Sequence, residues 1–146
     1  MPEPLPEAPA PQGTYGPALV HAGIAFSAGM TPRVHGELAV RGIVGRDLDV
    51  AAAQSAAAIA ARNALAAITG AAGGLERIER CLRLSVFVAC TDEFRELSAV
   101  ADGATAAIAE HTDTAALPVR SAIGVRSLPS GAPVEVELTA AVSTPP

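Results

Sequence analysis

The chain has 146 residues, enough for one domain, and half of them are apolar, so a compact core is expected rather than general disorder. Fifteen acidic residues outnumber ten basic ones, and the net charge of −5 disfavours a nucleic-acid partner, because neutralising phosphates requires a basic surface. All ten basic residues are arginine, and the lack of lysine excludes a Schiff-base enzyme and a P-loop.

The two ends of the chain are expected to lie outside the core. Residues 1–12 contain five prolines, and proline is not tolerated inside a helix or a sheet. We therefore predict an extended, mobile N-terminal arm over 1–12, a single domain over 13–142 and a short C-terminal tail over 143–146. The sequence shows neither a secretory signal nor a stretch apolar enough for a membrane span, so we expect a cytoplasmic protein without a membrane partner.

The first half of the domain is predicted to form two strands and a long helix. Two short strands are expected within 18–28, with a bend at Ala22-Gly23 between them, and a polar loop follows Pro32. The strongest helix signal covers 50–69, with Asp49 as the N-cap and Gly70 as the residue that ends the helix. Its many alanines would allow close packing on a sheet.

The second half is predicted to form a strand, a helix and two more strands. Residues 80–90 alternate between apolar and polar, which places Cys81 beside Arg83 on one face. Asp92 is the expected cap of a helix over 93–110. Alternation returns over 119–126 and 134–140, on either side of a turn at 129–131. The order ββ-α-β-α-ββ predicts an α+β domain with two helices on one face of a mixed sheet.

One arginine and two glutamates are the strongest candidates for a binding or catalytic role. Arg120 lies early in an apolar strand, where a guanidinium requires either an ion-pair partner within the protein or a bound anion such as a carboxylate. Glu135 and Glu137 share one face of the last strand, which is either a solvated surface or a place to orient a water molecule. A simple hairpin of the last two strands would place Arg120 opposite Ala140, so local pairing does not bring it to Glu135. The residues alone predict an anion site and leave the reaction open.

Metal and thiol chemistry are less well supported. Two cysteines, Cys81 and Cys90, have no second pair with which to build a zinc site, so no metal is expected. The lack of lysine and of a dinucleotide-binding fingerprint predicts that no cofactor is bound. Tyr15 opens the ordered region between two glycines, where its phenol could either line a ligand site or pack.

Motifs spread from residue 13 to residue 142 carry a resemblance to a known family. The end of the chain reads RSAIGV over 120–125, LP over 128–129 and GAPVEVE over 131–137. Earlier motifs follow in the same order, namely YGPA (15–18), FSAG (26–29), GIVG (42–45), DL (47–48), GL (74–75), Arg80, VFV (86–88) and DGAT (102–105). Together they resemble the Rid family of reactive-intermediate deaminases, also called the YjgF or endoribonuclease L-PSP family. The 42–45 and 102–103 stretches resemble a longer, divergent branch of it.

The resemblance implies a fold, an assembly and a reaction. The fold would be chorismate-mutase-like, and three copies would form a homotrimer with a barrel-like core and with clefts between subunits. The reaction would be the hydrolysis of 2-imino acids and their enamine tautomers to 2-keto acids and ammonia. Arg120 would hold the substrate carboxylate, Glu135 would orient the attacking water and Tyr15 would line the cleft. An imine carbon is already electrophilic, so binding, charge placement and one oriented water suffice.

Four positions depart from the pattern of the deaminating members. Ala28-Gly29-Met30 replaces their Ser-Gly-Gln, Ala122 stands where cysteine is frequent, and Asp102 stands where asparagine is frequent. The carboxylate clamp is retained while the other polar groups of the cleft are reduced, which predicts a bulkier, less polar substrate or a binding role. The alternative function is a trimer that binds a small carboxylate metabolite without turnover or with another reaction. Net charge and few aromatic residues disfavour the ribonuclease activity attached to the family name.

Overall fold

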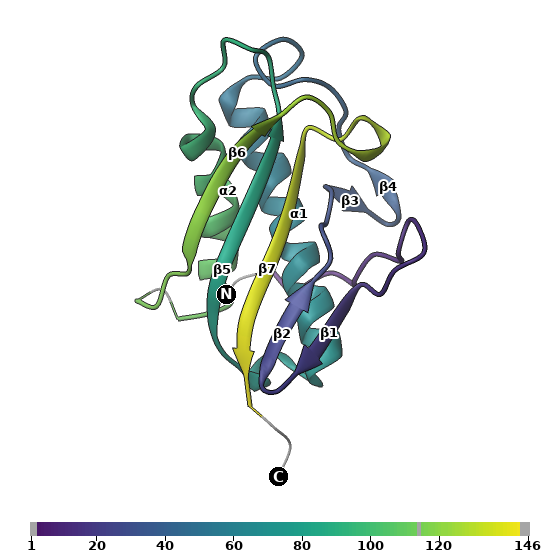
Figure 1. Ribbon diagram of the computed structural model, residues 1–146, viewed down its shortest axis with the longest axis vertical. Coiled ribbons are helices and arrows are strands. Elements are labelled where there is room, and N and C mark those ends of the chain that lie inside the picture. The colour runs from purple at the N-terminus through teal and green to yellow at the C-terminus, as the bar shows by residue number, and fades with distance from the viewer. Residues whose placement is uncertain (1–2, 114, 144–146) are drawn as a thin grey trace.

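A five-stranded sheet forms the centre of the molecule in the computed structural model, which describes residues 3–113 and 115–143. Its strands are β1 (Ala18–His21), β2 (Ile24–Ser27), β5 (Ile78–Ala89), β6 (Val119–Val125) and β7 (Val134–Val142). Their spatial order is β1-β2-β7-β5-β6 (Figure 1). Neighbouring strands are antiparallel except β5 and β6, which are parallel and are connected by a helix. The sheet is therefore mixed, as predicted.

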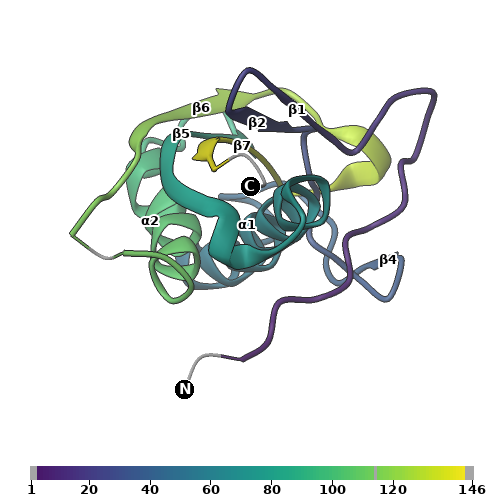
Figure 2. The same ribbon diagram turned by 90° about the horizontal axis from the view of Figure 1, so that it is seen from below.

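Two helices, α1 (Val50–Ala72) and α2 (Leu97–Ala109), lie side by side on one face of this sheet. Figure 2 shows them on the same side, while no other element of the described chain covers the opposite face. The predicted α+β arrangement, with two helices on one face of a mixed sheet, is confirmed. Among the described residues, neither helix is long and apolar enough to cross a membrane.

Helix α1 begins where predicted and ends later. The Asp49 carboxylate accepts a hydrogen bond from the backbone N–H of Ala52 at 2.8 Å, which caps the first turn. Gly70 remains inside the helix. The chain instead leaves the helix at Gly73, whose φ of 93° is left-handed and whose N–H donates to the Thr69 carbonyl. The helix therefore continues to Ala72 instead of ending at residue 69.

Helix α2 begins at Leu97 rather than at residue 93, and Asp92 does not cap it. Residues 91–96 form a turn in which the Phe94 N–H donates to the Thr91 carbonyl at 3.2 Å. Phe94 packs against the core and lies close to Gly45, whose loop crosses the end of the sheet. Because Phe94 packs against the core from this turn, the helix begins after it, at Leu97.

Strand β5 has an irregularity that changes the expected face of Cys81. The register with β7 shifts between Cys81 and Arg83, so these residues lie on opposite faces instead of sharing one. Cys81 is buried in the core, and this burial raises the pKa of its thiol to about 11. A reactive thiolate at Cys81 is therefore not supported.

The last two strands do not form a hairpin. Strand β5 lies between β6 and β7 and pairs with both, and the connection through a 3-10 turn at Pro129–Gly131 crosses its end. Another 3-10 turn, Leu75–Arg77, precedes β5. The polar loop predicted after Pro32 contains a small hairpin of β3 (Arg33–Val34) and β4 (Glu37–Leu38). Buried Asn63 on α1 holds β3 by donating to the carbonyls of Thr31 and Arg33.

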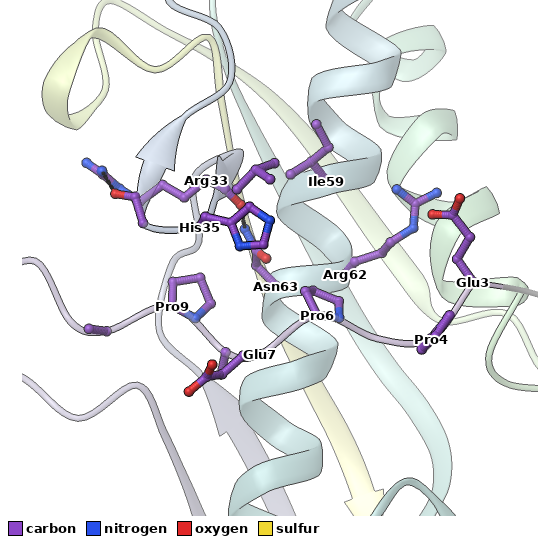
Figure 3. Close-up of a pocket in the computed structure, with 14 residues that line it drawn as sticks. Glu3, Pro4, Pro6, Glu7, Pro9, Arg33, His35, Ile59, Arg62 and Asn63 are labelled. Atoms are coloured by element: carbon purple, nitrogen blue, oxygen red, sulfur yellow. Dashed lines mark hydrogen bonds between the residues drawn. The ribbon is translucent and has the colours of Figure 1, made fainter.

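The N-terminal arm is extended, and part of it packs on the domain. No helix or strand is formed over residues 3–12, while Leu5 and Ala8 are partly buried against the core. The arm crosses α1 and, with the β3–β4 hairpin, encloses a groove of about 750 Å³ (Figure 3). Of the predicted C-terminal tail, residues 144–146 lie outside the described part of the chain.

The contact between the two helices depends on Gly103 of α2. A Cβ atom at this position would lie 2.3 Å from the Gln54 carbonyl oxygen of α1, which is far inside van der Waals contact. We predict that Gly103→Ala lowers the free energy of unfolding by about 2 kcal/mol, because the helices must separate. Gly70→Ala is the matched control, since a Cβ there has open space and improves helix propensity by about 1 kcal/mol. Urea unfolding measures both, and an equal effect of the two substitutions would contradict the close-approach interpretation.

Candidate functional site

Arg120 lies on the helix-facing side of the edge strand β6. It is in register with Leu84 of β5, whose side chain is fully buried beneath the helices. The Arg120 side chain is only 21% exposed and reaches α2. Ala122, two residues later, lies on the same face and is partly buried against the core.

A polar stripe on α2 holds the Arg120 guanidinium. Its Nη1 donates to Asp102 Oδ1 at 2.8 Å and to Thr105 Oγ1 at 3.0 Å. Its Nη2 donates to the Ser98 hydroxyl at 2.7 Å and to the Ser98 carbonyl at 3.3 Å. Ser98, Asp102 and Thr105 occupy positions i, i+4 and i+7, so one face of the helix presents all three. We call these three residues the α2 stripe.

Of the α2 stripe, Asp102 was expected from the sequence as a site residue, whereas Ser98 and Thr105 were not. The signal was present as polar residues at helical spacing in an otherwise apolar helix, although nothing in the sequence named the strand that they face. Ser98 and Thr105 are positioning residues, because they contact the guanidinium and fix its direction.

Glu135 lies on the other face of the sheet. It is in register with Phe87, three positions along β5 from Leu84, and so points away from the helices. Its carboxyl group rests against Gly29, where an added Cβ would be 2.6 Å from Glu135 Cδ. A larger residue at position 29 would force the Glu135 carboxyl group to move. Burial raises the pKa of the Glu135 carboxyl, and the negative charge of Glu137 on the same face raises it further.

Three other residues predicted for the site, Ala28, Met30 and Tyr15, do not contact Arg120 in the described structure. Ala28 is partly buried and donates its N–H to the Pro17 carbonyl at 2.8 Å. Met30 bridges to Val136 through two backbone hydrogen bonds, and its side chain is in the core. Tyr15 precedes β1 at the sheet edge opposite β6, and its hydroxyl accepts from the Gln12 N–H at 2.9 Å.

The predicted site is therefore divided within one chain. Arg120, Ala122 and the α2 stripe form one group, which we call the arginine half-site. Glu135 and Gly29 form the glutamate half-site, whereas Ala28 and Met30 pack against the core. The sheet itself separates Arg120 from Glu135, because the two side chains leave it in opposite directions.

The uncovered face of the sheet carries exposed apolar side chains around the glutamate half-site. Four of its large side chains are 44–60% exposed, namely Leu19, Phe26, Val119 and Ile123. The register aligns three of them in one row across all five strands, from Leu19 through Phe26 to Val119. Thr139 and Arg83 stand in this row between Phe26 and Val119, so the face is mixed, and large exposed apolar side chains on it are typical of a surface that another protein surface covers.

Comparison with known proteins identifies the family. A family model described as endoribonuclease L-PSP matches residues 5–142, which is nearly the whole chain. The chain belongs to this family. The resemblance predicted from the motifs is thereby confirmed, and the two-helix, mixed-sheet fold agrees with it.

Three relatives illustrate the similarity. The chain is 33% identical to Protein TCP17 of Trypanosoma cruzi over 134 residues, covering 91% of this chain and 84% of that protein. It superposes on Atu1372 of Agrobacterium tumefaciens with a TM-score of 0.87 at 37% identity, covering 92% and 86% of the two chains. It superposes on TdcF of E. coli, solved with bound serine, with a TM-score of 0.67 at 25% identity and 94% coverage of both chains.

The raised pKa of Glu135 predicts a pH-dependent gain in stability when its charge is removed. The folded state disfavours ionised Glu135, so Glu135 is destabilising at pH values where the unfolded chain carries the charge. Glu135→Gln should raise Tm at pH 7, and the gain should shrink as pH falls below the ordinary glutamate pKa, because both states are then protonated. Thermal unfolding from pH 3 to pH 8 checks this, with Glu93→Gln as a control at an exposed site. A gain that persists undiminished at pH 3 would contradict the assignment to charge burial.

Proposed function

We propose that this protein is a homotrimeric deaminase that hydrolyses 2-imino acids and their enamine tautomers to 2-keto acids and ammonia. The observation that carries the proposal is the pair of half-sites. Arg120 is held at a sheet edge in a geometry suited to an anion, and Glu135 is half-buried against Gly29. Family membership and the TdcF structure with bound serine, a small amino acid with a carboxylate, support the same class of ligand.

The trimer would complete a site that one chain leaves divided. Three copies packed through their uncovered sheet faces would bury Leu19, Phe26, Val119 and Ile123 in a central, barrel-like core. Each β6 edge would then lie beside the neighbouring subunit. Under this arrangement, Arg120 of one subunit and Glu135 of the next face a shared cleft.

The two half-sites would divide the chemistry. Arg120 would pair with the substrate carboxylate and thereby fix the position of the imine carbon. Glu135 would accept a hydrogen bond from the attacking water and take its proton as the C–O bond forms. Its raised pKa makes the carboxylate a better base near neutral pH. Glu135 would pass this proton to the imine nitrogen, which gives the carbinolamine, and would then transfer the hydroxyl proton to the same nitrogen as the C–N bond breaks, so that ammonia leaves and the 2-keto acid remains.

A carboxylate-binding role without fast turnover is the second candidate. It is favoured by the glutamate half-site, where Glu135 contacts Gly29 and neither Ala28 nor Met30 adds a polar side chain, since both pack against the core. With few groups to orient a polar substrate, the cleft would retain a carboxylate through Arg120 while accelerating imine hydrolysis little.

Release of 2-keto acid from freshly generated 2-iminopropionate and 2-iminobutyrate tests the deaminase proposal. We expect the wild-type protein to accelerate release and Arg120→Ala to lower this activity by about 100-fold, because the substrate carboxylate loses its partner. Arg126→Ala, which removes an exposed arginine beyond β6, serves as the charge-matched control and should retain activity. A folded trimer without any acceleration would favour the binding role instead.

Mixing two inactive variants tests whether the cleft is shared between subunits. Arg120→Ala and Glu135→Gln should each be inactive alone. Refolded together in equal amounts, they should regain about a quarter of wild-type activity, because one site in four receives both intact residues from different subunits. Activity that stays at the level of the separate variants would place both residues of a site in the same chain.

A further inference from the structure

Asp102 accepts a hydrogen bond from the guanidinium end of Arg120, the group with which a ligand carboxylate would also have to pair. We propose that Asp102 is an internal competitor for the carboxylate-binding position, so that a ligand enters the cleft only by displacing it. The proposal rests on the proposed role of Arg120 as the carboxylate clamp. It adds a residue that sets the affinity and selectivity of that clamp.

The hydrogen bonds of Arg120 support this competition. Nη1 and Nη2 carry four N–H groups, and the α2 stripe supplies an acceptor for each of them, two from side-chain oxygens on Nη1 and two from Ser98 on Nη2. Asp102 is the charged member of this set and the one that forms an ion pair, at 2.8 Å. An incoming carboxylate would therefore find the end of the guanidinium already paired with another carboxylate.

The exposure of the two partners indicates which one moves. The Asp102 side chain is 68% exposed, whereas that of Arg120 is 21% exposed. Asp102 can rotate into solvent and regain hydration there, while Ser98 and Thr105 keep the guanidinium in place. The displaced state then presents a desolvated, oriented cation to the ligand.

This exchange makes a carboxylate alone a poor ligand. Replacing one carboxylate by another on the same guanidinium leaves the number of charge pairs unchanged, so the exchange is close to neutral. A ligand must gain binding free energy from the rest of its structure to displace Asp102. The device would exclude simple carboxylates and favour ligands that also contact the glutamate half-site.

Binding of 2-ketobutyrate, a stable analogue of the proposed product, tests the inference by calorimetry on the assembled protein. Asp102→Asn keeps an oxygen acceptor for Nη1 and removes the charge, so we expect Kd to fall about fivefold relative to wild type. Asp102→Ala should also tighten binding. Glu93→Gln removes one charge just before α2 without contacting Arg120 in the described structure, and should change Kd by less than about twofold. Adding Arg120→Ala should abolish the gain.

The sign of the effect separates this role from a positioning role. If Asp102 only orients Arg120, both Asp102 variants will bind more weakly than wild type, which would overturn the inference. Binding that is insensitive to Arg120→Ala in both wild-type and Asp102→Asn backgrounds would also overturn it and leave the ion pair as a structural one. Imine hydrolysis measured on the same preparations reports separately on the proposed function. Tighter, Arg120-dependent binding in Asp102→Asn supports the inference even in a protein without turnover.

Discussion

The position of β5 between β6 and β7 determines the rest of the molecule. Its parallel pairing with β6 requires a connection that crosses back along the sheet, and α2 provides this connection on the same face as α1. Because both helices lie on that face, the alternating residues of β5 and β7 divide into a buried set and an uncovered set. The direction of every candidate residue follows from this division.

The two charged residues at the centre of the proposed chemistry lie in opposite electrostatic settings. Arg120 has an anionic partner and a set of hydroxyl and carbonyl acceptors on one helix, so its charge is fully compensated within the chain. Glu135 has no cation among the causes that shift its pKa, and burial and Glu137 both oppose its ionisation. The chain therefore satisfies the cation internally and leaves the carboxylate without a compensating charge.

Most of the fold followed from local patterns, and the exceptions had long-range causes. Asp49 and most of the alternating strand positions were correctly predicted because capping and period-two burial are encoded within a few residues, whereas the face of Cys81 was wrong because the register shift in β5 leaves no local signal. The end of α1 was misplaced because Gly70 and Gly73 have the same local preference, and only hydrogen bonding to Thr69 decides between them. The start of α2 was misplaced because the packing of Phe94 is tertiary.

The site was predictable in composition but not in arrangement. Arg120 and Glu135 stood out because charged residues in apolar strands are conspicuous. Their opposite faces could not be deduced, since the relation between β6 and β7 depends on β5 lying between them. Ser98 and Thr105 were not predicted for a similar reason. The role of a polar stripe on a helix can be inferred only when the strand that it contacts is known.

The alanine-rich inner face of α1 has a consequence for how this protein tolerates mutation. Eight of the buried residues of this helix are alanine, and alanine loses no rotamer freedom when it is buried. The helix–sheet contact is therefore ordered at little entropic cost, and it has few methyl groups left to remove. Random substitution there will almost always add atoms and overpack the contact, whereas on the sheet side substitution of the buried valines and leucines will more often remove atoms and leave a cavity.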